Sequence, residues 1–245
     1  MSVRISRSRK VSAIDQVLAG ERTACVAEAD CLDVLAGLPS ACIDLVVADP
    51  PYLIGAKSDG RGRASPWADL CNSSTWFQKW IGECRRVLKP TGALWSCLNW
   101  RSLPTFYKAS CDLGWSIESL LVWDKEWIGT GSMRGLRCSY ELVALWRMED
   151  FGIANRSAAD VQRFKWSSRK PHGHPAEKPV DLMRWLIEQS GVSEGIILDP
   201  FAGSGTSLVA ALDFKCRAVG IEVNETFAAI ARKRLAAWKP ESQVA

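Results

Sequence analysis

The chain has 245 residues, of which 47% are hydrophobic and 24% are charged. This length and this apolar content are enough for one large α/β domain or two small ones. The formal net charge of +4 is a weak hint of a polyanionic partner. The sequence has no run of about 18 apolar residues, so we predict no membrane span and no membrane partner.

The nine cysteines are odd in number and include no Cys-x-x-Cys pair. We interpret them as reduced thiols of a cytoplasmic protein, because a disulfide framework or a zinc site has a different spacing. His172 and His174 are the two histidines. We therefore predict no metal site.

Residues 1–21 are basic, with Arg4, Arg7, Arg9 and Lys10, and no apolar signal core follows them. We predict a disordered basic N-terminal tail, with an arm that contacts phosphates as the alternative. Residues 22–245 are predicted to form the folded domain.

Strand and helix patterns alternate from about residue 22, which predicts a mostly parallel sheet with helices on both faces. The expected strands are 23–29, 43–48, 93–98, 117–123, 140–146, 196–198 and 217–221. The expected helices are 31–38, 74–88, 103–113, 179–189, 206–212 and 224–238, and residues 89–92 are expected to turn the chain. Segments 53–73 and 147–175 break the alternation, and long irregular segments of this kind are usually functional or disordered.

The first conspicuous loop joins the strand at 196–198 to the helix at 206–212. Its residues are small, and the start of a helix favours a negative group. Glu222 ends the next strand, where a carboxylate can accept hydrogen bonds from ribose hydroxyls. Leu208 occupies the position of the third glycine of a dinucleotide site, which favours a nucleoside cofactor without a pyrophosphate. The alternative is a glycine turn that serves close packing.

The second loop, Asp49-Pro50-Pro51-Tyr52, follows the apolar strand at 43–48. The two prolines fix the backbone and remove N–H donors. The Asp49 carboxylate and the Pro50 carbonyl can then both accept hydrogen bonds from an exocyclic amino group, and Tyr52 can stack on a base. The alternative is a rigid turn with a buried tyrosine.

Together and in this order, the two loops resemble the amino-methylating DNA methyltransferases that use S-adenosylmethionine, in their permuted β group. The resemblance covers roughly residues 22–238. It implies a Rossmann-like methyltransferase fold, with a doubly wound, mostly parallel seven-stranded sheet that has one antiparallel strand. The strands at 43–47 and 196–198 would lie side by side at the topological switch point.

The resemblance also implies a cofactor site for S-adenosylmethionine. Asp30 and Cys31 would border its adenine, and the segment 174–179, with Lys178, would wall its methionine end. The other matching positions are Asp199, Phe201, Ala202, Gly203, Ser204, Gly205, Thr206, Glu222, Val223 and Asn224.

The implied reaction is site-specific methylation of double-stranded DNA at the N6 of adenine. The target base would flip out of the duplex, and its amino group would attack the methyl group directly, without a covalent enzyme intermediate. Asp at the first position of the tetrapeptide goes mostly with adenine in this family, whereas N4 of cytosine is the alternative. The residues expected to hold DNA phosphates are Lys57, Arg61, Arg63, Arg163, Lys165, Arg169 and Lys170, for which a solvated charged surface is the alternative.

Two other classes of function remain. Leu208 and the Asp49 loop argue against a nicotinamide-dependent oxidoreductase, and the intact loops argue against a non-catalytic DNA-binding protein that has kept the fold. Trp67, Trp127 and Trp166 are expected either to pack or to contact DNA. The sequence leaves open whether the protein is a homodimer and whether a restriction endonuclease accompanies it.

Overall fold

The computed structural model describes residues 7–51, 74–128, 135–167, 172–174 and 176–239. Within these ranges no helix has the length and apolar character needed to cross a membrane. The eight cysteines in the described ranges are all free thiols, and Cys71 lies outside them.

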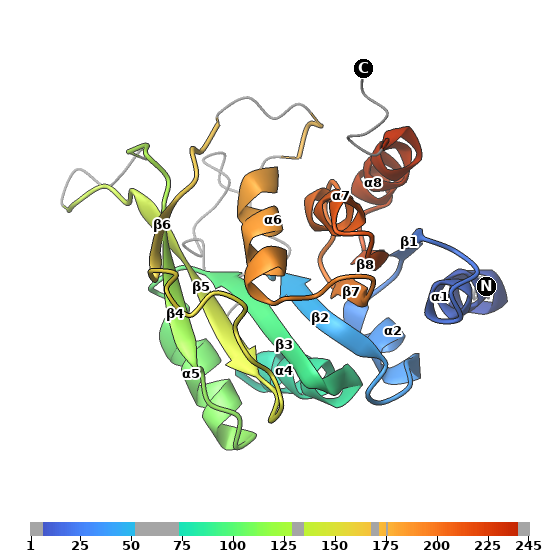
Figure 1. Cartoon of the computed structure of the whole chain (residues 1–245), viewed down its shortest axis with the longest axis horizontal. Coiled ribbons are helices and arrows are strands. Elements are labelled where there is room, and N and C mark those ends of the chain that lie inside the picture. The colour runs from blue at the N-terminus through green and yellow to red at the C-terminus, as the bar shows by residue number, and fades with distance from the viewer. Residues whose placement is uncertain (1–6, 52–73, 129–134, 168–171, 175, 240–245) are drawn as a thin grey trace, which may run out of the picture.

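The centre of the fold is an eight-stranded sheet with the strand order β1-β8-β7-β2-β3-β5-β4-β6 (Figure 1). The strands are β1 (Ala24–Glu28), β2 (Ile43–Ala48), β3 (Leu88–Leu98), β4 (Ser119–Asp124), β5 (Tyr140–Arg147), β6 (Val161–Arg163), β7 (Ile196–Asp199) and β8 (Arg217–Glu222). Strand β5 runs antiparallel to both of its neighbours, and every other pair is parallel. The predicted fold class, including one antiparallel strand, is therefore confirmed.

The predicted number of seven strands is wrong, because β6 adds an eighth at the edge beside β4. This strand has three residues and lies in segment 147–175, which we expected to be irregular. A strand of three residues is too short to give a recognisable alternation of polar and apolar positions.

Helices cover both faces of the sheet (Figure 1). They are α1 (Arg7–Leu18), α2 (Cys31–Gly37), α4 (Ser74–Val87), α5 (Leu103–Asp112), α6 (Val180–Gln189), α7 (Thr206–Asp213) and α8 (Glu225–Ala237). On one face α6 packs on α7 and α7 on α8, and on the other α2 and α5 both pack on α4. Helix α4 buries Phe77, Trp80 and Ile81 on one stripe, as its amphipathic pattern predicts.

The N-terminal segment differs from our prediction of a disordered tail. Helix α1 packs against β1 and β8, with Ile14 and Val17 buried. The Arg217 guanidinium donates hydrogen bonds to the carbonyls of Val17 and Leu18 at 2.6 and 2.8 Å, which satisfies carbonyls that the end of a helix leaves free. The few apolar residues of this basic segment are thus enough to pack α1 against the sheet.

Strand β2 lies between β7 and β3, so the carboxyl ends of β2 and β7 are adjacent, as predicted. Asp44 fixes this arrangement, because its carboxylate accepts hydrogen bonds from the Ile196 N–H and the Lys89 ammonium, both at 2.8 Å. The turn predicted at residues 89–92 is instead part of β3, where the register with β2 shifts. Between these pairs β3 has more residues than β2, and the additional residues form a bulge inside the strand. The chain therefore does not turn before the strand begins.

Candidate functional site

The two loops singled out in the sequence line a single pocket. Asp49 follows β2, and Phe201 to Gly205 lie between β7 and α7, which begins at Thr206. The pocket is also lined by His174, Glu177 and Lys178, which precede α6. The site is thus assembled at the carboxyl edge of the sheet by three stretches that are far apart in sequence.

The glycine loop comes close to its neighbours and needs left-handed backbone conformations. Gly203 and Gly205 have φ angles of +50° and +80°. A Cβ at Gly203 would lie 3.2 Å from His174 Nε2, and one at Gly205 would lie 3.1 Å from the Ala231 Cβ. Side chains at these positions would therefore both strain the backbone and collide with the next layer.

Asp199 holds the start of this loop. One of its oxygens accepts a hydrogen bond from the Phe201 N–H at 2.8 Å, and the other accepts one from the Ser207 hydroxyl. Burial raises the pKa of Asp199 to about 7. Asp199 lines the pocket but is buried, and both of its oxygens support the loop.

Glu222 connects the glycine loop to the start of α8. Its two oxygens accept hydrogen bonds from the N–H groups of Gly203 and Asn224, both at 2.8 Å. Asn224 in turn caps α8. Val223, between them, is 49% exposed and offers an apolar surface beside the carboxylate.

Asp30 lies close to Glu222, because β1 pairs with β8 in a register that puts Glu28 opposite Glu222. The Asp30 carboxylate caps α2 by accepting a hydrogen bond from the Leu32 N–H at 2.8 Å. Cys31 is buried, and burial raises the pKa of its thiol to about 12. The thiol therefore stays protonated at neutral pH, and its role here is to pack in the core.

The remaining cofactor candidates, Ala202, Ser204 and Thr206, are buried. Arg234 reaches the loop from α8 and donates hydrogen bonds to the Ser204 carbonyl at 3.3 Å and the Thr206 hydroxyl at 2.9 Å. These residues thus shape the loop through internal contacts.

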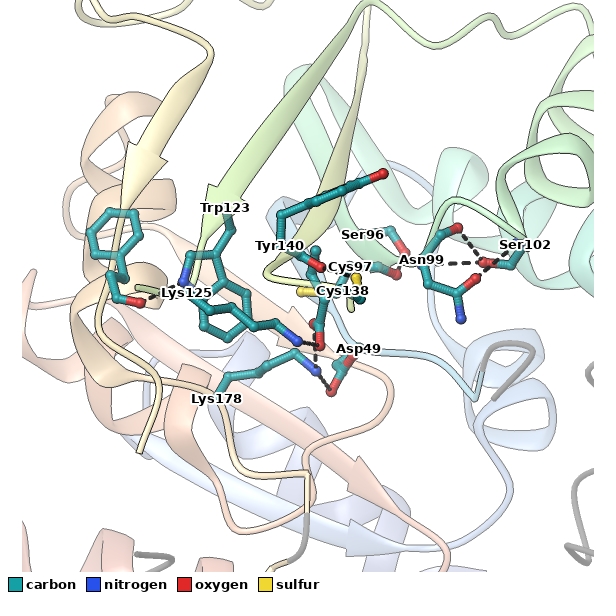
Figure 2. Close-up of polar contacts among 12 residues, drawn as sticks. Asp49, Ser96, Cys97, Asn99, Ser102, Trp123, Lys125, Cys138, Tyr140 and Lys178 are labelled. Carbon is teal, nitrogen blue, oxygen red and sulfur yellow. Dashed lines mark hydrogen bonds and ion pairs between the residues drawn. The ribbon is translucent and has the colours of Figure 1, made fainter. Parts of the chain in front are cut away.

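Asp49 is the end of a chain of alternating charges (Figure 2). Its Oδ2 lies 2.7 Å from Lys178 Nζ, and Lys178 Nζ lies 3.3 Å from Glu141 Oε2. The other Glu141 oxygen lies 2.5 Å from Lys125 Nζ. We predicted Lys178 as a cofactor residue, and its position between two carboxylates gives it a contact with the target loop as well.

The second oxygen of Asp49 is different. Asp49 Oδ1 is buried and, within the described part of the chain, has no hydrogen-bond partner. Burial raises the pKa of Asp49, although Lys178 opposes this effect. Burial would also raise the pKa of Glu141, but Lys178 and Lys125 together bring it below its ordinary value. A buried acceptor without a partner is costly unless a ligand supplies a donor.

The structure describes only part of the predicted DNA-contacting set. Arg163 and Lys165 are exposed at the end of β6, and Arg163 Nε lies 3.4 Å from an Asp124 oxygen. Pro50 is buried and Pro51 is half-buried. The other predicted DNA contacts, Lys57, Arg61, Arg63, Arg169 and Lys170, lie outside the described residues, as do Trp67 and, from the catalytic loop, Tyr52.

Sequence reasoning missed Lys125 and Glu141. Both are charged residues at the ends of apolar strands, but an isolated charge at such a position is usually solvated, so the sequence alone does not single them out. Two exposed aromatic groups lie at the same edge of the sheet: Trp100, which we did not predict, and Trp127, which we expected either to pack or to contact DNA. Trp100 is 50% exposed and has the Arg101 guanidinium 4.6 Å from its ring centroid, and Trp127 stacks on Trp166 with centroids 4.1 Å apart.

Within the described residues no cluster of three or more His, Cys, Asp or Glu side chains is arranged to hold a metal ion. Asp49 and Lys178 instead pair with each other, Glu177 pairs with His172 and Arg234, and Asp199 accepts a hydrogen bond from a backbone N–H. The arrangement places Asp49 Oδ1, which has no hydrogen-bond partner among the described residues, next to a glycine loop that begins a helix.

Comparison with known proteins gives consistent matches. The family model for N6/N4 DNA methylases matches residues 43–233. The chain is 34% identical to YubD of Escherichia coli (strain K12) over 214 residues, which cover 86% of this chain and 89% of YubD. It is 25% identical to the DNA adenine methyltransferase YhdJ of the same organism over 250 residues, which cover 88% of this chain and 84% of YhdJ.

Among solved structures, the cytosine-N4-specific PvuII DNA methyltransferase matches with a TM-score of 0.70 at 14% identity. The match covers 87% of this chain and 86% of that one. At this identity the likeness concerns the fold.

Proposed function

Because the chain belongs to the N6/N4 DNA methylase family, we propose that it transfers a methyl group from S-adenosylmethionine to the N6 amino group of adenine in double-stranded DNA. One observation carries this proposal. The buried Asp49 Oδ1, unbonded within the described residues, lines the same pocket as the glycine loop. An exocyclic amino group would supply the donor that this oxygen lacks.

The chemistry needed at Asp49 is modest. A hydrogen bond from the amino group to Asp49 Oδ1 would turn the nitrogen lone pair out of the aromatic ring. The nitrogen could then form its bond to the methyl carbon while the electron pair of the carbon–sulfur bond stays on sulfur. The Asp49 carboxylate would then accept one amino proton and pass it to solvent, and S-adenosylhomocysteine would leave as the neutral thioether. Positioning and stabilisation of the developing positive charge by the carboxylate would supply most of the rate gain.

In this proposal the cofactor site is formed at the ends of three strands, β1, β7 and β8. Glu222 ends β8, where a carboxylate can accept hydrogen bonds from a ribose, and Asp30, which follows β1, would border the adenine. Val223 offers an apolar surface for the adenine ring. The glycine loop, with His174 packed 3.2 Å from the position of a Gly203 Cβ, would surround the methionine end.

The DNA surface of the proposal is the carboxyl edge of the sheet on both sides of Asp49. The loop from Asn99 to Ser102 lies on one side of Asp49, and Lys125 and Trp123 lie on the other (Figure 2). These loops lead to the exposed Trp100 and Trp127. Exposed aromatic rings next to Arg101, Arg163 and Lys165 are the groups that stack on bases and neutralise phosphates.

Product analysis tests the proposal. The protein and its Asp49→Asn variant are incubated with unmethylated genomic DNA and S-adenosylmethionine, and the digested nucleosides are identified by mass spectrometry. Asp112→Asn, which changes an exposed carboxylate on α5, is the matched control. We expect N6-methyladenine from the wild type and the control, and a rate lower by about two to three orders of magnitude in the Asp49 variant.

Other products would correct the proposal in defined ways. N4-methylcytosine would keep the role of Asp49 and overturn the choice of base. Bound cofactor without any methylated base would instead support a DNA-binding protein that has kept the fold. Equal activity of Asp49→Asn and the wild type would refute the role of the carboxylate.

A further inference from the structure

The charge chain that ends at Asp49 contains two residues to which the proposed reaction gives no role. Glu141, at the start of β5, pairs with Lys178 and with Lys125, which lies near the end of β4. Figure 2 shows Lys125, Lys178 and Asp49 gathered at this point. Because β5 is the antiparallel strand, its first residues lie at the same edge of the sheet as the last residues of β4. This pairing brings Lys125 and Glu141 together.

All four charged side chains are largely withdrawn from water. The exposed fractions are 20% for Asp49, 8% for Lys178, 17% for Glu141 and 13% for Lys125. Two ammonium groups and two carboxylates have a formal charge of zero in sum. Partly buried charges are tolerated when each is paired, and removing one partner leaves the others uncompensated.

The two carboxylates are paired to different extents: Glu141 is paired through both oxygens and Asp49 through one. Glu141 has an ammonium group on each of its two oxygens, Lys125 at 2.5 Å and Lys178 at 3.3 Å. Asp49 has Lys178 on one oxygen, while the other has no hydrogen-bond partner within the described residues. Lys178 thus fixes the rotation of the Asp49 carboxylate, and Glu141 fixes Lys178.

The outer end of the chain is also held in place. The Lys125 ammonium lies 5.3 Å from the centroid of the Trp123 ring, a distance at which the face of a tryptophan attracts a cation. Trp123 is fully buried, and its indole N–H donates a hydrogen bond to the Phe164 carbonyl at 2.7 Å. The position of Lys125 is therefore set by the residue that follows β6 as well as by β5.

We propose that Lys125 and Glu141 are positioning residues that act through Lys178: they hold the Asp49 carboxylate in place, and their opposite charges set how strongly the site discriminates between the positively charged methyl donor and its neutral product. The inference rests on the proposed function. S-adenosylmethionine and S-adenosylhomocysteine differ at the sulfur by one methyl group and one positive charge. The ratio of their affinities therefore reports the electrostatic potential at the methyl-transfer site.

The direction of each change follows from the charges. Without the Glu141 carboxylate, the chain carries a net positive charge next to the sulfonium, which disfavours the donor. Without the Lys125 ammonium, the chain carries a net negative charge, which favours it. Removing both restores neutrality.

Calorimetry of both ligands on four proteins tests the proposal. They are the wild type, Glu141→Gln, Lys125→Met and the double variant. In Glu141→Gln we expect the affinity for S-adenosylmethionine to fall about tenfold relative to that for S-adenosylhomocysteine, the effect of one nearby charge on an ionic equilibrium. Lys125→Met should change this ratio in the opposite direction, and the double variant should return it towards the wild-type value.

Other outcomes would overturn the inference. Both single variants could leave the affinity ratio unchanged, or could change it in the same direction through general disturbance of the site. Glu141→Asp, which keeps the charge, must stay closer to the wild-type ratio than Glu141→Gln. If the wild type bound neither ligand, the proposed function itself would fail, whereas binding with an unchanged ratio in the variants refutes only the role of Lys125 and Glu141.

Discussion

The buried carboxyl group of Asp199 predicts an unusual dependence of stability on pH. Burial raises the pKa of this group from 3.8 to about 7 in the folded protein. Because the folded-state pKa is raised, the folded protein keeps a proton that the unfolded chain loses between these two values. Its free energy of unfolding therefore falls as the pH rises through this window and levels off above it.

The change in the free energy of unfolding depends on how much of the range between the two pKa values the experiment crosses. From about pH 5 to about pH 8, the shift acts over roughly two pH units, up to the folded-state pKa, which corresponds to about 3 kcal/mol. Asp199→Asn removes the titration with little change in shape. The Asn oxygen can still accept the hydrogen bond from the Phe201 N–H, and the amide can donate to the Ser207 hydroxyl oxygen.

Urea denaturation of the wild type and of Asp199→Asn at several pH values measures the difference. The wild type should lose about 3 kcal/mol more than the variant between about pH 5 and about pH 8. Asp112→Asn, with its exposed carboxylate, should follow the wild type. Parallel pH curves for the wild type and Asp199→Asn would refute the assignment of this dependence to Asp199.

Three further predictions concern the cofactor, DNA and the N-terminal helix. Glu222→Gln should weaken S-adenosylmethionine binding about tenfold by calorimetry, the order expected for losing charged hydrogen bonds, and unchanged affinity would exclude Glu222 from the cofactor site. Trp127→Ala should weaken DNA binding by about 1–3 kcal/mol in a fluorescence titration, the cost of one stacking contact, while Val161→Ala, at another exposed apolar position on this side, should not. Val17→Ala should lower the free energy of unfolding by about 1–2 kcal/mol in urea, whereas no change would mean that α1 does not contribute to stability.

Much of the fold could be predicted because most strands are long apolar runs. The strand predicted at 43–48 has the same bounds in the structure as β2, and its neighbour β7 was expected from the order of the two loops. Strand β6 could not be predicted in this way, since its three residues are paired with β4 only by tertiary structure. Helix α1 was missed because its basic composition is also that of a disordered tail.

The residues of the candidate site likewise fall into those that the sequence predicts and those that it does not. Asp49, the glycine loop and Glu222 belong to contiguous segments whose sequence indicates a function. Glu141 and Lys125 carry no such signal, because an isolated charge at the end of a strand is usually solvated. Their pairing depends on the direction of β5, and the sequence predicted one antiparallel strand without identifying it.

Lys178 shows why the direction of a strand matters for assigning a residue's role. In the segment 174–179 it was predicted to face the cofactor. The antiparallel direction of β5 places Glu141 at the carboxyl edge of the sheet, and Lys178 then lies between that carboxylate and Asp49. If β5 ran parallel to its neighbours, Glu141 would lie at the opposite edge and Lys178 would pair with Asp49 alone. The charge next to the target loop is therefore set by the topology of the sheet as much as by the loop itself.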